Sequence, residues 1–278
     1  MILNEDYYDN KTSLIEGVRY NKENDMFIFN FSDDDVNNII KLRNVGYEST
    51  IYNHLYYFGY EFEPNIESSL RSRFIKSIKF PDNSISNEDK TVFIKNAIIS
   101  LDSFINLMNY DILVFPQSMS ELTRDLIKYL SKINRPKFVS IELIKELPYN
   151  IEFDYDMFSN EILNSKTANG KPRYTEAQKK QVLSNIESMM DNIHKSDYFS
   201  IARNIKKSKY RPYISNFYKF KNKDDEELYK QLNNDNVLIV DDIVTSGSTI
   251  LLLLKTLRII NNSNNITIFS LLGKNLNL

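Results

Sequence analysis

Two adjacent aspartates, Asp241 and Asp242, follow the apolar run Val237–Val240 and precede a loop of hydroxyl residues with one glycine, Thr245–Thr249. The glycine lets backbone N–H groups close on an anion because no Cβ stands in the way. The hydroxyls add donors, and a helix beginning in this loop adds the partial positive charge of its N-terminus, which suits a phosphate. The carboxylates would repel that phosphate and better suit hydroxyl groups or a divalent cation. A ribose 5-phosphate has both groups, because its phosphate and its vicinal diol lie about one sugar apart.

The whole stretch Val237–Thr249 resembles the 5-phosphoribosyl-1-pyrophosphate (PRPP) motif of the type I phosphoribosyltransferases. The resemblance implies that Asp241 and Asp242 hold the ribose 2′- and 3′-hydroxyls and are the catalytic acidic pair. It also implies a Mg²⁺ ion near this pair, held mostly by PRPP oxygens and water. The 5′-phosphate would be bound by the loop residues Thr245, Ser246, Gly247, Ser248 and Thr249. The alternative is a strand end whose residues only cap the next helix, but capping does not require a paired Asp before the loop.

By the same resemblance, the pyrophosphate would bind the loop that follows an earlier strand, formed by Pro116, Gln117, Ser118 and Met119. Exposed N–H groups in such a loop make an anion-binding nest. A basic residue is frequent there in the family, and this sequence has Gln117, so either the backbone suffices or the pyrophosphate is held weakly.

The family's mobile loop is expected within Ser165–Tyr174, which is small and polar and carries Lys171 and Arg173. These two cations would neutralise pyrophosphate. An ordinary solvated loop is the alternative for them.

The competence-associated ComF-like branch is the most similar part of the family, on the evidence of Phe74–Phe80 and the phosphate loop. Purine salvage enzymes of the hypoxanthine–guanine type usually have an Asp at the position of Thr245, so this sequence counts against that substrate. The resemblance extends from about Arg73 to Leu271.

From Arg73 onward the sequence shows alternating strand and helix patterns, which predict an α/β fold. The elements of this fold must position the residues named above. We expect an open, parallel, twisted sheet with helices on both faces, the type I phosphoribosyltransferase fold, as a core over residues 73–278. Ligands of such sheets bind beyond the carboxyl ends of the strands. The predicted strands are Arg73–Phe80, Ile112–Phe115, Lys137–Ile144, Tyr213–Phe220, Val237–Val240 and Ile266–Leu271. The predicted helices are Asp89–Met108, Ser120–Leu130, Tyr174–His194, Asp224–Leu232 and one from Ser248.

Residues 1–72 are expected to form an N-terminal α+β hood or accessory region. Leu14–Tyr20 and Met26–Phe31 are typical of a hairpin, and Ser32 is expected to cap a helix that ends near Arg43. The segment Thr50–Phe62 is rich in aromatic residues. It is either a stacking platform for a base or, as we favour, aromatic packing across strands of a small sheet.

Composition excludes several classes of protein. Cysteine is absent and His54 and His194 are the histidines, which rules out disulfide scaffolds, thiolate metal clusters, cysteine nucleophiles and histidine cages. The formal net charge of -2 gives no global field for nucleic acid, which we do not expect as a partner. The first residues lack a signal-peptide pattern and the most apolar run, Thr249–Ile260, is short, so we expect a cytoplasmic protein without a membrane partner.

These patterns predict a Mg²⁺-dependent phosphoribosyltransferase, a glycosyltransferase of nucleotide metabolism. It would bind PRPP, transfer the 5-phosphoribosyl group to a nitrogenous base or another small acceptor, and release pyrophosphate. The alternative is a non-catalytic sensor of PRPP or nucleotides, or an adapter for DNA uptake or assembly that retains the fold. The sequence identifies neither the acceptor nor the oligomeric state, and a homodimer stays open.

Overall fold

The structure is a computed structural model that describes residues 16–30, 38–42, 49–51, 53–81, 83–102, 105–118, 120–133, 139–233, 235–262 and 264–274. The chain divides into two compact units. Unit 1 comprises Met1–Glu142, Leu232–Gly247 and Ser263–Leu278, and unit 2 comprises Leu143–Gln231 and Ser248–Asn262. This division differs from the boundary that the sequence suggested between residues 72 and 73.

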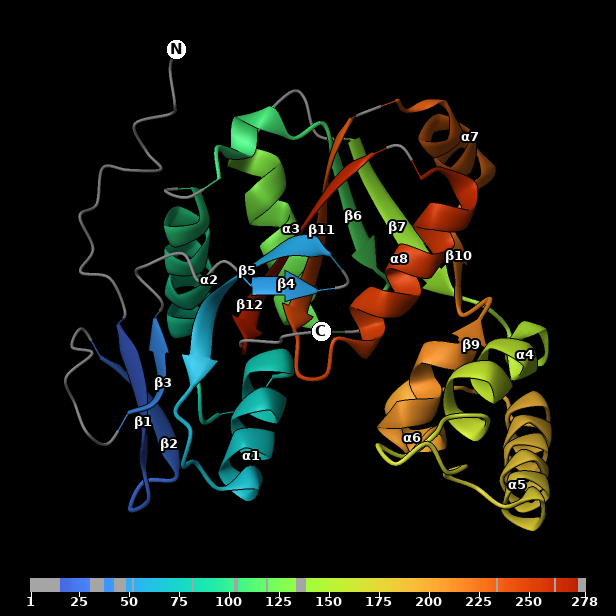
Figure 1. The fold of residues 1–278 in the computed structure, drawn as a ribbon. Helices are drawn as coiled ribbons and strands as arrows, with labels where there is room; N and C mark the ends of the chain where they lie inside the picture. Colours follow the sequence, from blue (N-terminus) through green and yellow to red (C-terminus); the bar gives the residue numbers. More distant parts are fainter. Residues whose placement is uncertain are drawn as a thin grey trace. The chain divides into compact units, whose positions relative to one another are not determined.

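A mixed sheet forms the centre of unit 1 (Figure 1). Its parallel part consists of four strands in the order β6 (Ile112–Pro116), β11 (Asn236–Ile243), β12 (Asn265–Gly273) and β5 (His54–Phe62). Beyond β5 the sheet continues with antiparallel strands: β3 (Asn38–Leu42), β1 (Gly17–Asn21) and β2 (Met26–Asn30). A short strand, β4 (Ser49–Ile51), pairs antiparallel with β5. The predicted α/β class and the parallel centre are confirmed, while the sheet as a whole is mixed.

In the described part of unit 1, the sheet is accompanied by helices α1 (Ser68–Lys79), α2 (Asn87–Asp102) and α3 (Glu121–Ile133), with a 3-10 turn at Leu107–Asn109. Helix α2 contacts β5 and α3, and α3 contacts β11 and α1. Gly59 on β5 permits the close approach of α2, because a Cβ at this position would lie 2.5 Å from the Cβ of Ala97.

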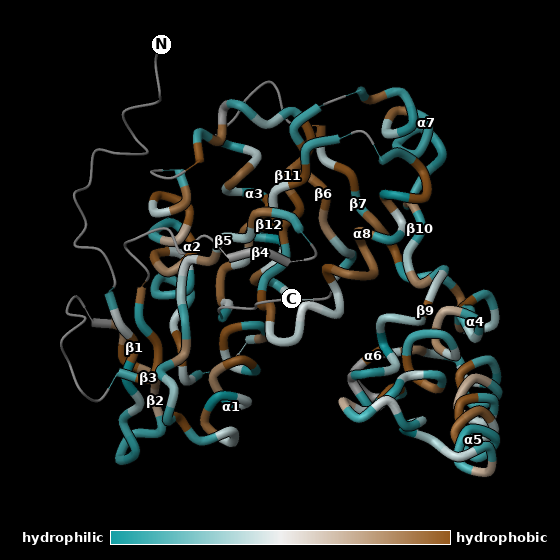
Figure 2. The backbone as a smooth tube through the Cα atoms, viewed as in Figure 1, coloured by the Kyte–Doolittle hydropathy of each residue, from teal (hydrophilic) through white to brown (hydrophobic). Residues whose placement is uncertain are grey.

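Strands β6 and β11 are rich in hydrophobic residues, as the colour along their backbone shows (Figure 2). Each of the residues from Val237 to Val240 is fully buried. A strand that is buried on both faces is expected at the centre of a parallel sheet. Strand β11 is therefore fixed in register on both sides, and whatever follows Val240 is placed at the carboxyl edge.

Unit 2 contains mainly short helices. Strand β7 (Val139–Lys145) begins in unit 1 beside β6 and ends in unit 2, where β10 (Tyr218–Phe220) pairs with it antiparallel. The longer helices of unit 2 are α5 (Glu176–His194), α7 (Lys223–Gln231) and α8 (Ser248–Ile260). The remaining elements are η3 (Pro148–Asn150), β8 (Glu152–Phe153), α4 (Tyr155–Phe158), η4 (Ser159–Leu163), α6 (Ile201–Asn204), η5 (Ser208–Tyr213) and β9 (Ile214–Ser215).

Hydrogen bonds of side chains to the backbone stabilise the start of α5 and attach η5 to α8 in unit 2. Thr175 and Gln178 form a capping box at the start of α5, in which each side chain accepts a hydrogen bond from the backbone N–H of the other residue. The Lys255 side chain of α8 donates to the backbone oxygens of Pro212 and Ile214, which fixes the end of η5 on that helix. No helix in the described part of the chain has the length and hydrophobicity of a membrane span.

Three predictions about elements change with the structure. Arg73–Phe80, predicted as a strand, belongs mostly to α1, whose buried residues Phe74, Ser77 and Ile78 follow helical spacing. The predicted helix from Ser32 begins outside the described residues, and Asn38–Leu42, within it, is strand β3 because it is buried between β1 and β5. Tyr213–Phe220 is divided between the end of η5 and two short strands.

The aromatic segment lies in the large sheet rather than in a small one, and rings of β5 pack against helices α1 and α2. The rings of Tyr60 and Phe93 stack with centroids 3.8 Å apart. Tyr56 and Tyr60 are fully buried, so these side chains offer no exposed platform for a base.

Candidate functional site at the carboxyl end of β11

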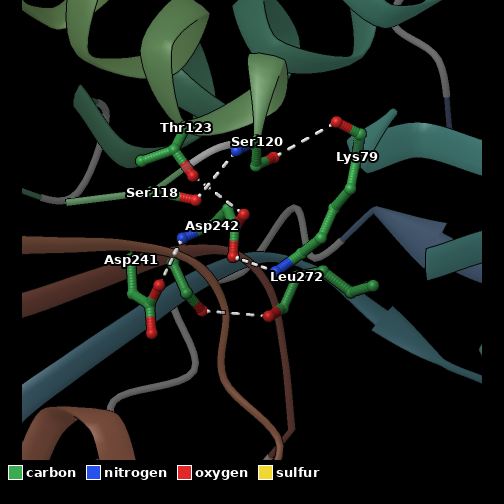
Figure 3. Close-up of polar contacts among 8 residues, drawn as sticks. Lys79, Ser118, Ser120, Thr123, Asp241, Asp242 and Leu272 are labelled. Carbon is green, nitrogen blue, oxygen red and sulfur yellow. Dashed lines mark hydrogen bonds and ion pairs between the residues drawn. The ribbon is translucent and has the colours of Figure 1, made fainter. Parts of the chain in front are cut away.

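Asp241 and Asp242 lie in the last part of β11, at the edge where the parallel strands of unit 1 end. Asp241 is 7% exposed and Asp242 is 2% exposed. Successive side chains of a strand point to opposite faces of the sheet, so the two carboxylates meet different neighbours. Figure 3 shows Asp242 within a polar cluster and Asp241 directed away from it.

Asp242 is held by two other elements of unit 1. The Lys79 ammonium at the end of α1 lies 2.8 Å from Asp242 Oδ1, and the Thr123 hydroxyl of α3 donates to Asp242 Oδ2 over 2.8 Å (Figure 3). A buried carboxylate needs such a cation and hydrogen bonds, because burial without them is strongly unfavourable. Asp242 therefore joins α1, α3 and β11 through one carboxyl group.

The predicted pyrophosphate loop adjoins this cluster. Pro116 is the last residue of β6, Gln117 is exposed, and Met119 lies outside the described residues. The Ser118 hydroxyl accepts the Ser120 N–H over 3.1 Å, and the Ser120 hydroxyl donates to the backbone oxygen of Lys79 over 3.4 Å. These contacts bring the end of the predicted loop next to the residues that hold Asp242.

Asp241 has a different environment. Its Oδ1 atom accepts the N–H of Asp242 over 2.9 Å, and its carboxylate has no ion pair with a lysine or arginine among the described residues. Burial, and then the charge of Asp242, raise the pKa of the Asp241 carboxyl to about 7, although the charge of Lys79 opposes the rise. Asp241 can therefore gain or lose a proton near neutral pH, and a cation or donor from a ligand would favour its charged form.

The loop after the acidic pair is tied to the sheet at its start and leads into a helix at its end. The Val244 N–H bonds the backbone oxygen of Leu272 over 2.9 Å, which joins the start of the loop to β12. Thr245 and Ser246 are exposed, and helix α8 begins at Ser248. Gly247 has φ +69°, a left-handed conformation that other residues adopt at a cost. The predicted convergence of the N–H groups from Ser246 to Thr249 on a phosphate stays a prediction.

Lys171 and Arg173, the predicted mobile-loop residues, lie in unit 2 and are exposed. They belong to a tight turn in which the Thr167 N–H bonds Lys171 O over 2.8 Å and the Gly170 N–H bonds Thr167 O over 2.9 Å. Gly170 adopts φ +74° there. Where this turn lies relative to the acidic pair stays a prediction.

The donor set at the acidic pair fits Mg²⁺ only together with a ligand. In the described ranges, no cluster of three or more His, Asp or Glu side chains is arranged to hold a metal ion. Both Asp242 oxygens already have protein partners, which leaves Asp241 as the carboxylate that could face a hydrated cation. Mg²⁺ commonly uses one or two carboxylates, with water and substrate phosphates as its other ligands, so this arrangement is compatible with it.

Sequence reasoning missed Lys79, Ser120 and Thr123 as members of the site. The sequence pattern predicts a strand at Lys79, whereas this residue lies in the last turn of helix α1. The sequence did contain one signal, since a pair of adjacent aspartates after a buried strand requires a cation from elsewhere in the chain. It did not show which of many lysines supplies it.

Comparison with known proteins adds no assignment. No family model matches the chain, and none of the curated proteins matches its sequence.

Proposed function

We propose that the carboxyl end of β11 binds the 5-phosphoribosyl group of PRPP and that the protein is a phosphoribosyltransferase of type I fold. The reaction would transfer that group to a nitrogenous base or another small acceptor and release pyrophosphate. The proposal rests on the motif resemblance and on one observation of the structure. Gly247, with φ +69°, lies between a buried acidic pair at the carboxyl edge of a parallel sheet and the start of α8.

This arrangement suits a sugar phosphate for electrostatic reasons. Successive backbone N–H groups around a left-handed residue at a helix N-terminus can form an anion-binding nest. Asp241 lies a few residues earlier on the same chain, and its carboxylate is not neutralised by a cation of the described residues. A carboxylate in this position accepts hydrogen bonds from sugar hydroxyls, whereas a phosphate would be repelled by it.

The residues would act mainly by positioning and electrostatics. The loop would fix the 5′-phosphate, and Asp241 would orient the ribose hydroxyls and offset positive charge on the ring as the bond to pyrophosphate breaks. When bound, Mg²⁺ supplies charge neutralisation for the departing pyrophosphate. The acceptor would form a bond to the anomeric carbon as the bond to pyrophosphate breaks. It would then lose a proton to solvent or to a carboxylate.

A non-catalytic role in binding PRPP or a nucleotide is the second candidate, and one observation favours it. Asp242, one of the two expected ribose ligands, has both carboxylate oxygens bonded, one to Lys79 and one to Thr123. A site in which one acid holds the fold together could retain affinity for the sugar phosphate without the second acid of a transferase.

A ligand-dependent thermal shift tests the proposal without presuming a reaction. Ribose 5-phosphate, PRPP with Mg²⁺, and inorganic pyrophosphate should each raise the melting temperature, whereas free ribose should not. Failure of every phosphorylated compound to do so, with no binding by calorimetry, would contradict the proposal. Release of pyrophosphate from PRPP with a panel of nucleobases then separates the transferase from the non-catalytic binder.

A further inference from the structure

The Lys79 side chain is partly exposed although it is paired with a buried carboxylate. Its side chain is 26% exposed, while the carboxylate it contacts, on Asp242, is 3% exposed. Within the described ranges, Lys79 makes the ion pair that reaches the acidic pair. The Lys79 side chain is therefore paired with Asp242 and still partly exposed to solvent.

The charge balance at the site calls for such a cation. Two carboxylates lie side by side in sequence against one lysine, and a ligand with a pyrophosphate group would add further negative charge. An ammonium carries three donors on a flexible stem, so it can keep one bond to a carboxylate while it donates to a phosphoryl oxygen.

The backbone of Lys79 is anchored on the predicted pyrophosphate loop. The Ser120 hydroxyl donates to Lys79 O over 3.4 Å, and the Ser120 N–H bonds the Ser118 hydroxyl over 3.1 Å (Figure 3). The end of α1 is thus tied to the segment that follows β6. In this way Lys79 stands between that segment and the acidic pair, although it comes from an element that neither motif includes.

We propose that Lys79 is an anion-binding residue of this site, which holds the pyrophosphate group of the ligand while it remains paired with Asp242. This proposal rests on the proposed function. The exposed loop residue Gln117 carries no charge, so the positive charge for the anion comes from α1 instead. The ribose and its 5′-phosphate are bound elsewhere and do not depend on Lys79.

The test compares Lys79→Met and Lys79→Arg with Lys76→Met. Lys76 is a matched control because it lies in the same last turn of α1 and is exposed, but makes no ion pair with Asp242. Calorimetry would measure binding of inorganic pyrophosphate, PRPP with Mg²⁺, and ribose 5-phosphate to each full-length variant. Circular dichroism and thermal unfolding would confirm that each variant is folded.

Loss of a charge-assisted hydrogen bond should weaken binding of pyrophosphate and PRPP about 10- to 100-fold in Lys79→Met. Ribose 5-phosphate should bind within about twofold of wild type, Lys79→Arg should retain most of the pyrophosphate affinity, and Lys76→Met should match wild type. Pyrophosphate affinity that is unchanged in folded Lys79→Met would overturn the proposal, as would an equal loss for ribose 5-phosphate.

The same experiment distinguishes failure of this inference from failure of the proposed function. If wild-type protein binds ribose 5-phosphate but Lys79→Met keeps its pyrophosphate affinity, the role of Lys79 is wrong and the sugar-phosphate site stands. If wild-type protein binds none of the three ligands, both proposals are wrong. If Lys79→Met does not fold, Lys79→Gln in the presence of ribose 5-phosphate provides the second variant, and the same two comparisons decide.

Discussion

Two charged regions of the molecule handle their charges in opposite ways. At the carboxyl end of β11, the Asp242 carboxylate is buried and bonded to Lys79 and Thr123. In the turn before α5, Lys171 and Arg173 are exposed and form no ion pair with an acidic side chain of the described residues. The first region uses the charge of Asp242 to hold elements of unit 1 together, whereas both charges of the second region are exposed.

This difference determines what each region can contribute. Buried charges are preorganised but coupled to folding, so any substitution there alters stability as well as binding. Exposed charges add little to stability and are screened by salt, so their substitution should change ligand binding alone. Stability and affinity measured on the same variants therefore test whether the contrast is real.

The largest effect is expected for Gly247→Val. A branched side chain at φ +69° adds about 1–2 kcal/mol of backbone strain, and its Cβ would intrude where a phosphate must approach. We expect binding of every 5′-phosphorylated ligand to be lost, as measured by calorimetry with ribose 5-phosphate.

Gly170→Val is the matched control for that strain. Gly170 has φ +74°, and a Cβ added to it would meet no other atom within 4 Å, so the substitution adds strain without blocking a site. This variant should lose similar stability and still bind ribose 5-phosphate. If the two variants bind ribose 5-phosphate with equal affinity, Gly247 is not part of the binding site.

Asp241→Asn should stabilise the protein at pH 8. The pKa of the Asp241 carboxyl is raised from 3.8 to about 7 in the folded state, so folding favours the protonated carboxyl. The stability that the protonated carboxyl contributes is fully present below pH 3.8 and is lost as the pH rises through about 7. An amide keeps the acceptor for the Asp242 N–H and removes the buried charge. The free energy of unfolding should rise by about 2–4 kcal/mol at pH 8.

Below about pH 4 the stability gain of Asp241→Asn should disappear, because the native carboxyl is then neutral as well. Urea unfolding across this pH range measures the effect, and calorimetry on the same variant should show weakened PRPP binding. If the increase in the free energy of unfolding does not depend on pH, the charged Asp241 carboxylate does not destabilise the wild-type protein.

Asp242→Asn should act in the opposite direction on stability. It leaves the Lys79 ammonium beside a neutral amide, and the expected loss is about 1–3 kcal/mol in the free energy of unfolding. The same urea titrations measure it at pH 8. If Asp242→Asn stabilised the protein as Asp241→Asn does, the two carboxylates would not have the distinct roles inferred from their contacts.

The smallest effect on stability is expected for Lys171→Ala combined with Arg173→Ala. Both side chains are exposed, so the free energy of unfolding should change by less than about 0.5 kcal/mol. If the turn is the mobile loop, binding of PRPP and pyrophosphate should weaken while ribose 5-phosphate binding is kept. Equal losses for both ligands would contradict the loop assignment.

Strands β6, β11 and β12 of the parallel centre were predictable because they carry continuous apolar runs, whereas β5 was expected in a separate N-terminal region. The capping box at Thr175 and the acidic pair after Val240 are local patterns that need no tertiary information. The sequence predicted a glycine in the phosphate loop because it has no Cβ, and the structure adds that Gly247 has a left-handed conformation.

The errors arose where tertiary contacts outweigh local pattern. Phe74, Ile78 and Phe80 fall on one face if the segment is a strand, whereas Phe74, Ser77 and Ile78 fall on one face if it is a helix, and packing decides for the helix. Asn38–Leu42 follows acidic residues that suggest a helix start, yet burial between two strands makes it β3. The contact of Lys79 with Asp242 depends on such long-range outcomes, because α1 must first be a helix that ends at the sheet.

The pairing of β5 with β12 has a consequence for how the chain is made. The register Thr267↔Leu55 joins a strand near the beginning of the described chain to one near its end. During synthesis, β5 and β11 must each wait with an open edge until β12 leaves the ribosome, because β12 lies between them. Open edges of apolar strands can pair with other chains, so the nascent protein is exposed to aggregation until β12 takes its place.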